Sequence, residues 1–173
     1  MGKVSLALVP ITEGEIMAEP LSQEDYERLK GGFRNYRDLL LCQFLRGTGL
    51  RISEALSLSP EHIAERGPLP ILTGLKAGQP WETGAAYYVL VRRGKRKVEK
   101  SELYERVYLS PALALALVGW VKGTGRKPME TLFGVQRRAA GFIFAKAGLK
   151  ALGRRVHPHE FRGLYIKTLL DGG

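Results

Sequence analysis

The feature that most constrains the fold is one pair of β-type segments in a chain whose other apolar segments have helical spacing. Residues 86–93 and 103–109 are rich in β-branched and aromatic side chains, a composition typical of strands. The segment between them, Gly94-Lys-Arg-Lys-Val-Glu-Lys-Ser, is strongly basic and too long for a tight turn. The sequence therefore predicts a mainly α protein with one small antiparallel β-hairpin, an α+β fold.

Capping residues, glycines and prolines divide the rest of the chain into six expected helices. Ser22 suits an N-cap and acidic residues follow it, so the first helix begins there and runs to about residue 30. The other five are expected at 33–46, 52–58, 111–121, 131–147 and 159–170. Residues 64–86 are rich in Gly, Pro and Thr and predict a long loop with one short strand. We expect residues 1–19 to form a tail or linker and residues 20–173 to form a single domain.

The charge of the chain is unevenly distributed. Its 173 residues include 27 Lys and Arg against 17 Asp and Glu, a net charge of +10. Residues 1–90 are slightly acidic, and the excess of basic residues begins at Arg92. A basic surface attracts polyanions, so nucleic acid is the first partner to consider and an anionic membrane the second.

Several classes of protein are disfavoured. The one cysteine, Cys42, cannot form an internal disulfide or anchor a zinc site with several cysteines, and its apolar surroundings indicate a core position. No secretory signal, Walker loop or complete dinucleotide fingerprint is found, and no apolar run is long enough to span a bilayer. We therefore expect a cytoplasmic protein without membrane contact, cofactor or metal.

The first candidate site lies around Arg51, in Thr48-Gly-Leu-Arg-Ile-Ser-Glu-Ala-Leu. Arg51 falls between the end of one expected helix and the start of the next. An arginine there is poorly placed for the helix dipole but well placed to join helix-end N–H groups in holding an anion. Glu54 follows one turn later and could orient the guanidinium, although a surface ion pair explains the spacing equally well.

The second candidate site is His157-Pro-His-Glu-Phe-Arg, where His159 and Arg162 share one face of a helix. A guanidinium offers a planar, two-pronged donor to phosphate oxygens, and an imidazole can donate a proton or a hydrogen bond. The spacing of the two histidines fits no common metal site. The basic hairpin tip fits phosphate contact and a solvated turn about equally well.

Three motifs in this order resemble the catalytic domain of the tyrosine recombinases, or phage integrases. They are the Thr48 motif, the Gly94-Lys95 hairpin, and His157-Pro-His-Glu-Phe-Arg-Gly-Leu-Tyr-Ile-Lys-Thr-Leu-Leu-Asp-Gly-Gly, together covering about residues 21–173. The resemblance implies breakage and rejoining of double-stranded DNA through a 3′-phosphotyrosine, without metal, as in the integration or recombination of mobile elements. It also implies assembly on DNA, and we expect a monomer for the free chain.

The same resemblance implies roles for individual residues. Arg51 and Arg162 clamp the scissile phosphate, and His159 assists at one of its oxygens. Lys95 corresponds to the hairpin lysine that protonates the leaving 5′ oxygen, with Lys97 and Lys100 as alternatives. Glu54 corresponds to the acidic residue that supports the first arginine. Further basic residues are expected to contact DNA: Arg92, Arg93, Arg96, Lys97, Lys100, Arg137, Arg138, Arg154 and Arg155.

One part of the family pattern is not found in these residues, namely the Leu-Gly-His motif and the nucleophilic tyrosine after it. Tyr165 lies where the family has an aromatic core residue, and at least one of Tyr87 and Tyr88 is expected in the core. Three hypotheses follow: a catalytic core whose tyrosine lies in a further segment, a short DNA-binding or regulatory protein, and a split recombinase that receives the tyrosine in trans. In each case we expect the chain alone to bind DNA and not to react. RNA is less favoured as a partner, because no aromatic-rich stacking motif accompanies the basic residues.

Overall fold

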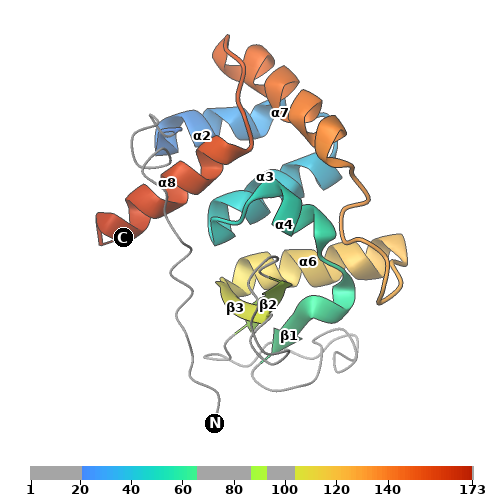
Figure 1. The fold of residues 1–173 in the computed structure, drawn as a ribbon. Coiled ribbons are helices and arrows are strands. Elements are labelled where there is room, and N and C mark those ends of the chain that lie inside the picture. Colours follow the sequence, from blue (N-terminus) through green and yellow to red (C-terminus); the bar gives the residue numbers. More distant parts are fainter. Residues whose placement is uncertain (1–20, 66–86, 93–103, 173) are drawn as a thin grey trace. The chain divides into compact units, whose positions relative to one another are not determined.

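The computed structural model describes residues 21–65, 87–92 and 104–172 (Figure 1). In chain order the elements are α2 (Gln23–Leu29), η1 (Lys30–Gly32), α3 (Tyr36–Thr48), α4 (Ile52–Ser57), η2 (Pro60–His62), β1 (Ile63–Glu65), β2 (Tyr87–Arg92), β3 (Tyr104–Leu109), α6 (Pro111–Thr124), α7 (Arg137–Leu152) and α8 (His159–Leu170). The structure is mostly helical with one small antiparallel sheet, which confirms the expected α+β fold.

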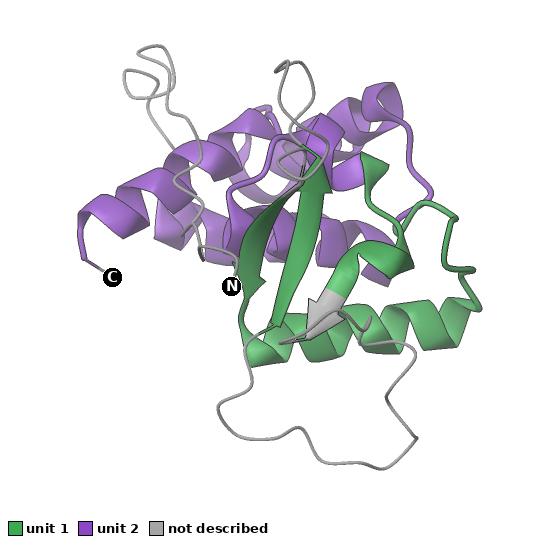
Figure 2. Ribbon diagram, turned by 60° about the horizontal axis from the view of Figure 1, so that its bottom comes forward, with its two compact units in different colours: residues 1–8, 57–132 green, residues 9–56, 133–173 purple. Residues whose placement is uncertain are grey.

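The chain divides into two compact units (Figure 2). Unit 1 contains the described residues of 57–132, and unit 2 contains those of 9–56 and 133–173. The domain expected over 20–173 includes parts of both units, and its folding as a single domain stays a prediction.

Unit 1 is built on the expected hairpin. Strands β1, β2 and β3 are neighbours in that order and run antiparallel. In the hairpin, Tyr87 pairs with Leu109 and Arg92 pairs with Tyr104, so the register is unbroken over six pairs. Tyr87 and Tyr88 are both buried, which confirms that at least one is a core residue. The basic tip lies outside the described residues.

Helix α6 completes unit 1 and contacts β2 (Figure 2). It begins at Pro111 because Ser110 Oγ accepts a hydrogen bond from the backbone N–H of Leu113 at 3.2 Å, and it ends at Gly125, a left-handed residue with φ 67°. Its buried face is aliphatic and includes Leu117 and Val121. Within the described ranges, no helix combines the length and apolar character needed to cross a bilayer.

Unit 2 is a bundle of α2, α3, α4, α7 and α8 with an aromatic core. The ring of Phe161 in α8 meets Tyr26 and Phe144 edge-on at centroid distances of 6.2 Å and 5.2 Å, and Phe144 also meets Phe33 at 5.3 Å. These contacts join helices that are far apart in the sequence. Cys42 is fully buried as expected, and burial raises the pKa of its thiol.

Most helix boundaries follow the predicted signals. Helix α8 covers the expected residues, and Ser22 caps α2 by accepting from the N–H of Asp25. Helix α3 begins later than expected, because Asn35 Oδ1 accepts from the N–H of Asp38 at 2.9 Å and so acts as its N-cap.

The prediction of a helix over 131–147 is wrong at both ends, since α7 covers Arg137–Leu152. Phe133 is buried outside any helix, and Gly134 has a φ of 63°, so the chain enters the helix only at residue 137. Gly148 does not end the helix; its missing side chain leaves room for the backbone at Arg154, whose carbonyl would lie 2.5 Å from a Cβ. The helix ends at Gly153, which has the left-handed φ of 72°.

Candidate functional site

The candidate site lies in unit 2, at the turn between α3 and α4. Helix α3 ends at Gly49, whose φ of 67° reverses the chain, and Leu50 is buried directly after it. Arg51 comes next, with its side chain half-buried and its carbonyl accepting from the N–H of Ala55 at 3.0 Å. The turn therefore places Arg51 at the start of α4, as the sequence predicted.

Glu54 supports Arg51 through the backbone. Its Oε1 accepts a hydrogen bond from the backbone N–H of Arg51 at 2.9 Å. A carboxylate that accepts from an N–H at a helix start fixes the chain direction there. The idea that Glu54 also orients the guanidinium stays a prediction.

Arg162 stabilises the same turn from α8. Its side chain has no solvent exposure, and its Nη1 donates a hydrogen bond to the carbonyl of Gly49 at 3.1 Å. It is one of the largest fully buried side chains of the described residues. A buried charge is costly unless it is hydrogen-bonded, so this bond ties α8 firmly to the turn that carries Arg51.

A pocket of about 340 Å³ opens beside this turn, in front of the first residues of α7 and α8. Arg137 and His159 begin those two helices, and both helix N-termini carry partial positive charge. The described residues that line the pocket include no carboxylate: Arg51, Ile52, Ser53, Arg137, Gly141, His157, Pro158 and His159. Two guanidinium groups, two imidazoles and two helix N-termini suit the pocket to an anion such as a phosphate.

The connector before α8 is held by Glu160. Its Oε2 accepts from the backbone N–H of His157 at 2.7 Å, and its Oε1 accepts from Arg154 Nη1 at 2.9 Å. The two bonds fix the chain between α7 and α8 and so place His157 and His159 at one pocket. Among the residues that the structure describes, no group of three His, Cys, Asp or Glu side chains is arranged to hold a metal ion.

The structure brings part of the predicted site together. Arg51 and His159 line the pocket, whereas Arg162 is fully buried and does not line it, and its Nη1 donates to the carbonyl of Gly49, two residues before Arg51. The hairpin residues Lys95, Arg93, Arg96, Lys97 and Lys100 lie outside the described residues, so their roles stay predictions.

The remaining basic residues that were expected to contact DNA differ in their surroundings. Arg137 lines the pocket and is exposed. Arg92, Arg138 and Arg155 are also exposed, and the Arg138 guanidinium lies 6.0 Å from the centre of the Phe142 ring. Arg154 forms an ion pair with Glu160, so part of its role is structural.

Sequence reasoning missed two features of the site. His157 lines the pocket, and its position two residues before the start of α8 could have indicated that it lies beside His159. Tyr165 packs its ring against Gly49, where a Cβ would overlap it. Burial raises the pKa of Tyr165, which is the opposite of the lowered pKa that activates a nucleophile.

Comparison with known proteins identifies a relative by sequence and several solved structures with a similar fold. A tyrosine recombinase from Pseudothermotoga lettingae is 25% identical over 158 residues, which cover 88% of this chain and 47% of that protein. The XerA recombinase has 18% identity and a TM-score of 0.62, over 95% of this chain and 54% of XerA. XerH recombinase bound to difH substrate has 19% identity and a TM-score of 0.62, over 90% of this chain and 43% of XerH. No family model matches the sequence.

A third similar structure is the Tn1549 transposon integrase in complex with circular intermediate DNA, with 16% identity and a TM-score of 0.53, over 94% of this chain and 56% of that one. This chain is thus similar to the tyrosine recombinases in sequence and shares their fold. It spans about half the length of the relatives it matches.

Proposed function

We propose that this chain contains the phosphate-binding core of a site-specific DNA recombinase of the tyrosine type. The observation that carries the proposal is the pocket in unit 2, where Arg51, Arg137, His157 and His159 surround one space without a carboxylate among its described lining residues. The sequence resemblance to a tyrosine recombinase and the shared fold support it.

In the proposed reaction, a tyrosine hydroxyl gives its proton to water as its oxygen bonds to the scissile phosphorus, and the bond from phosphorus to the 5′ oxygen breaks. Arg51 and Arg162 offset the negative charge that gathers on the phosphate oxygens in the transition state. His159, at the start of α8, donates a hydrogen bond to one of these oxygens. Lys95 supplies the proton that the 5′ oxygen takes up on leaving.

The two arginines have different surroundings and hence different parts in the proposal. Arg51 is half-buried and lines the pocket, so it is the residue that meets the phosphate first. Arg162 is fully buried and binds the Gly49 carbonyl. We therefore assign Arg162 the task of holding the turn that positions Arg51, while its positive charge offsets phosphate charge from the buried side of that turn.

The attacking tyrosine is proposed to come from outside residues 1–173. Tyr165 does not fit the task, because its ring is packed on Gly49 and burial raises its pKa. In this proposal a further segment of the same protein or another chain supplies the tyrosine. A covalent adduct between residues 1–173 and nicked DNA would contradict it.

The proposed partner is double-stranded DNA. Among the similar structures, XerH is bound to its difH substrate and the Tn1549 integrase is in complex with circular intermediate DNA. In this chain the exposed cations Arg137 and Arg155 belong to the segments around the pocket and are proposed to contact neighbouring phosphates.

Binding of a fluorescent DNA duplex at increasing salt concentration tests the proposed partner. Each phosphate contact releases counterions, so six or more contacts would weaken binding about 10³-fold or more between 50 and 200 mM salt. A duplex that does not bind, or an affinity that is independent of salt, would contradict the proposal.

A further inference from the structure

A second hollow in unit 2, of about 570 Å³, lies between α7 and the segment that joins η1 to α3. Its lining includes the apolar side chains of Phe33, Ile143, Ala147 and Leu149. We call this hollow the α7 groove. It shares no lining residue with the candidate phosphate pocket.

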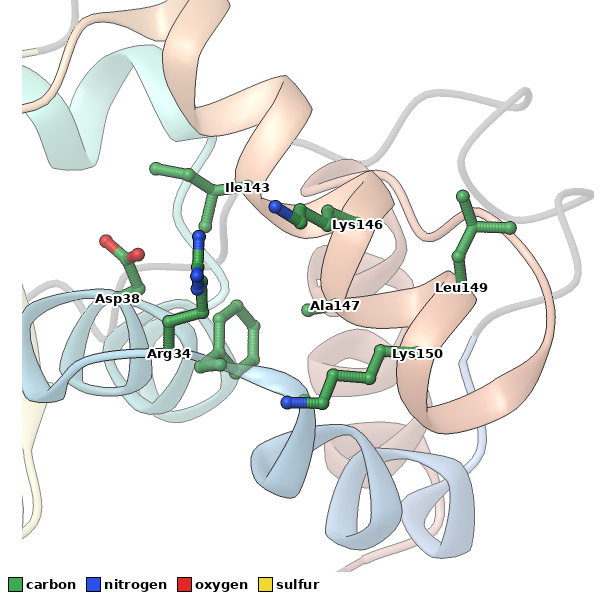
Figure 3. A pocket seen from close by; sticks show the side chains of 9 residues that line it. Arg34, Asp38, Ile143, Lys146, Ala147, Leu149 and Lys150 are labelled. Carbon is green, nitrogen blue, oxygen red and sulfur yellow. The ribbon is translucent and has the colours of Figure 1, made fainter.

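Three exposed cations surround the apolar floor of the α7 groove: Arg34, Lys146 and Lys150. Figure 3 shows both lysines extending from α7 toward the segment that carries Arg34. The one carboxylate in the lining, Asp38, forms an ion pair with Arg37 at 3.0 Å and has a side chain only 7% exposed. An occupant of this groove must therefore combine apolar side chains with negative charge.

The apolar character continues along the surface of α7. Phe142 is 66% exposed and Leu149 is 51% exposed. Residues 142, 146 and 149 are spaced by four and three positions, so they share one face of the helix. Large exposed apolar side chains grouped around a hollow are typical of a surface that another segment covers.

The chain itself contains a segment of this chemistry. Residues 4–20 include Glu13, Glu15 and Glu19 but no Lys or Arg, in a chain with a net charge of +10. Apolar residues such as Ile11 and Ile16 lie among these glutamates. Residues 1–20 are outside the described part of the chain, and they lead directly into α2.

The distance along the chain also fits. The path from Leu21 along α2 and η1 to Gly32, at the edge of the groove, is about 17 Å from the rise per residue of the two helix types. About five extended residues span that length, so residue 16 and the residues before it can reach the groove. Both α2 and η1 contact α7, so this path runs beside the helix that carries the two lysines.

We propose that the acidic and apolar segment 9–16 docks in the α7 groove of its own chain, with Glu13 and Glu15 against Lys146 and Lys150 and with Ile11 or Ile16 on the apolar floor. The docked segment covers the apolar floor and neutralises part of the cationic rim. This inference is independent of the proposed recombinase chemistry.

Carbodiimide cross-linking of the full chain tests the proposal, because this reagent joins only carboxylates and amines in direct contact. Peptide mass spectrometry should find Glu13 or Glu15 joined to Lys146 or Lys150. The internal control is Lys167, an exposed lysine of α8 that lies close to the start of α2, where the segment joins the bundle. The closeness follows from Arg46, which donates hydrogen bonds to both Gln23 and Thr168. A segment without a docking site would react with Lys167 at least as often, and that result would overturn the proposal.

A variant pair tests the groove itself. Leu149→Asn places a neutral polar group on the apolar floor and should lower the yield of the cross-link at least fivefold, with both lysines still present. Leu170→Asn, at a more exposed leucine of α8, is the matched control and should leave the yield unchanged. Equal yields in the two variants would contradict docking in the groove. In a mixture of isotope-labelled and unlabelled chains, cross-links between the two kinds would show docking on a second copy and would likewise overturn the proposal.

Discussion

The structure shows that Glu54 supports Arg51 through the backbone N–H of that residue. Its carboxylate accepts from the backbone N–H of Arg51, and a neutral amide oxygen can accept the same bond. We therefore expect Glu54→Gln to bind DNA within about twofold of the native chain, and Glu54→Ala to lose about 1 kcal/mol of stability and to bind more weakly. Equally weak binding by both variants would show instead that the negative charge of Glu54 is needed.

Arg162 has a buried charge whose removal affects folding as well as function. Its side chain is fully buried and bonded to the Gly49 carbonyl. We expect Arg162→Ala to lower the free energy of unfolding by about 3 kcal/mol, since it leaves both a cavity and an unsatisfied carbonyl. Urea denaturation measures the change, and Arg51→Ala, at a half-buried position, should cost less than about 1 kcal/mol by the same assay. Equal stability of the two variants would contradict a structural role for Arg162.

For single residues, the sequence indicates which side chains are candidates for the site better than it indicates what those side chains contact. Arg51, His159 and Arg162 stand out because their types and spacings suit a phosphate. The bond from Arg162 to Gly49 joins residues 113 positions apart, and no local pattern encodes such a contact.

At the scale of elements, the turn after α3 depends on a glycine for two separate reasons. Gly49 has a φ of 67°, and the ring of Tyr165 fills the space where a side chain would begin. Gly153 after α7 has a similar φ of 72°, but a Cβ there would meet no atom within 4 Å. The two positions form a matched pair that separates backbone strain from steric overlap.

We expect Gly153→Ala to cost about 1 kcal/mol, which is the strain of a left-handed alanine. Gly49→Ala adds overlap with the Tyr165 ring and should cost about 2 kcal/mol more. Denaturant titration of the two variants measures the difference. Equal losses would indicate that Tyr165 can move away from the turn at little cost.

The sequence predicts a helix boundary well where a capping residue within the first turn sets it. It predicts the boundary wrongly where a contact with a distant part of the chain sets it. Ser22 and Pro111 begin their helices as expected, because their effect lies within the first turn. Gly148 looked like a helix end, but it is buried within α7, where the chain at Arg154 passes close to it. A glycine that admits a neighbouring backbone has the same sequence signal as a glycine that ends a helix.

At the scale of the whole molecule, the basic half of the sequence does not coincide with one structural unit. Arg92 belongs to unit 1, whereas Arg137 and Arg155 belong to unit 2. Arg51 lies in the slightly acidic half of the sequence and yet lines the same pocket as Arg137. Net charge thus favours a polyanionic partner, and the proposed phosphate site is the pocket at the starts of α4, α7 and α8.

The most direct test of this account compares two arginine variants of the same chain for binding to a DNA duplex. Arg51 lines the pocket, whereas Arg28 lies on α2 with a side chain 57% exposed and does not line it. Fluorescence anisotropy over a series of salt concentrations gives both affinities and their salt dependence, and circular dichroism verifies that each variant is folded.

We predict that Arg51→Ala weakens binding about 10-fold, the value of one charged hydrogen-bonding contact, and also lowers the salt dependence by about one counterion. Arg28→Ala should bind within about twofold of the native chain, because it removes only an exposed surface charge. If the two variants bind equally well, the phosphate does not bind at the Arg51 pocket and the central claim is wrong.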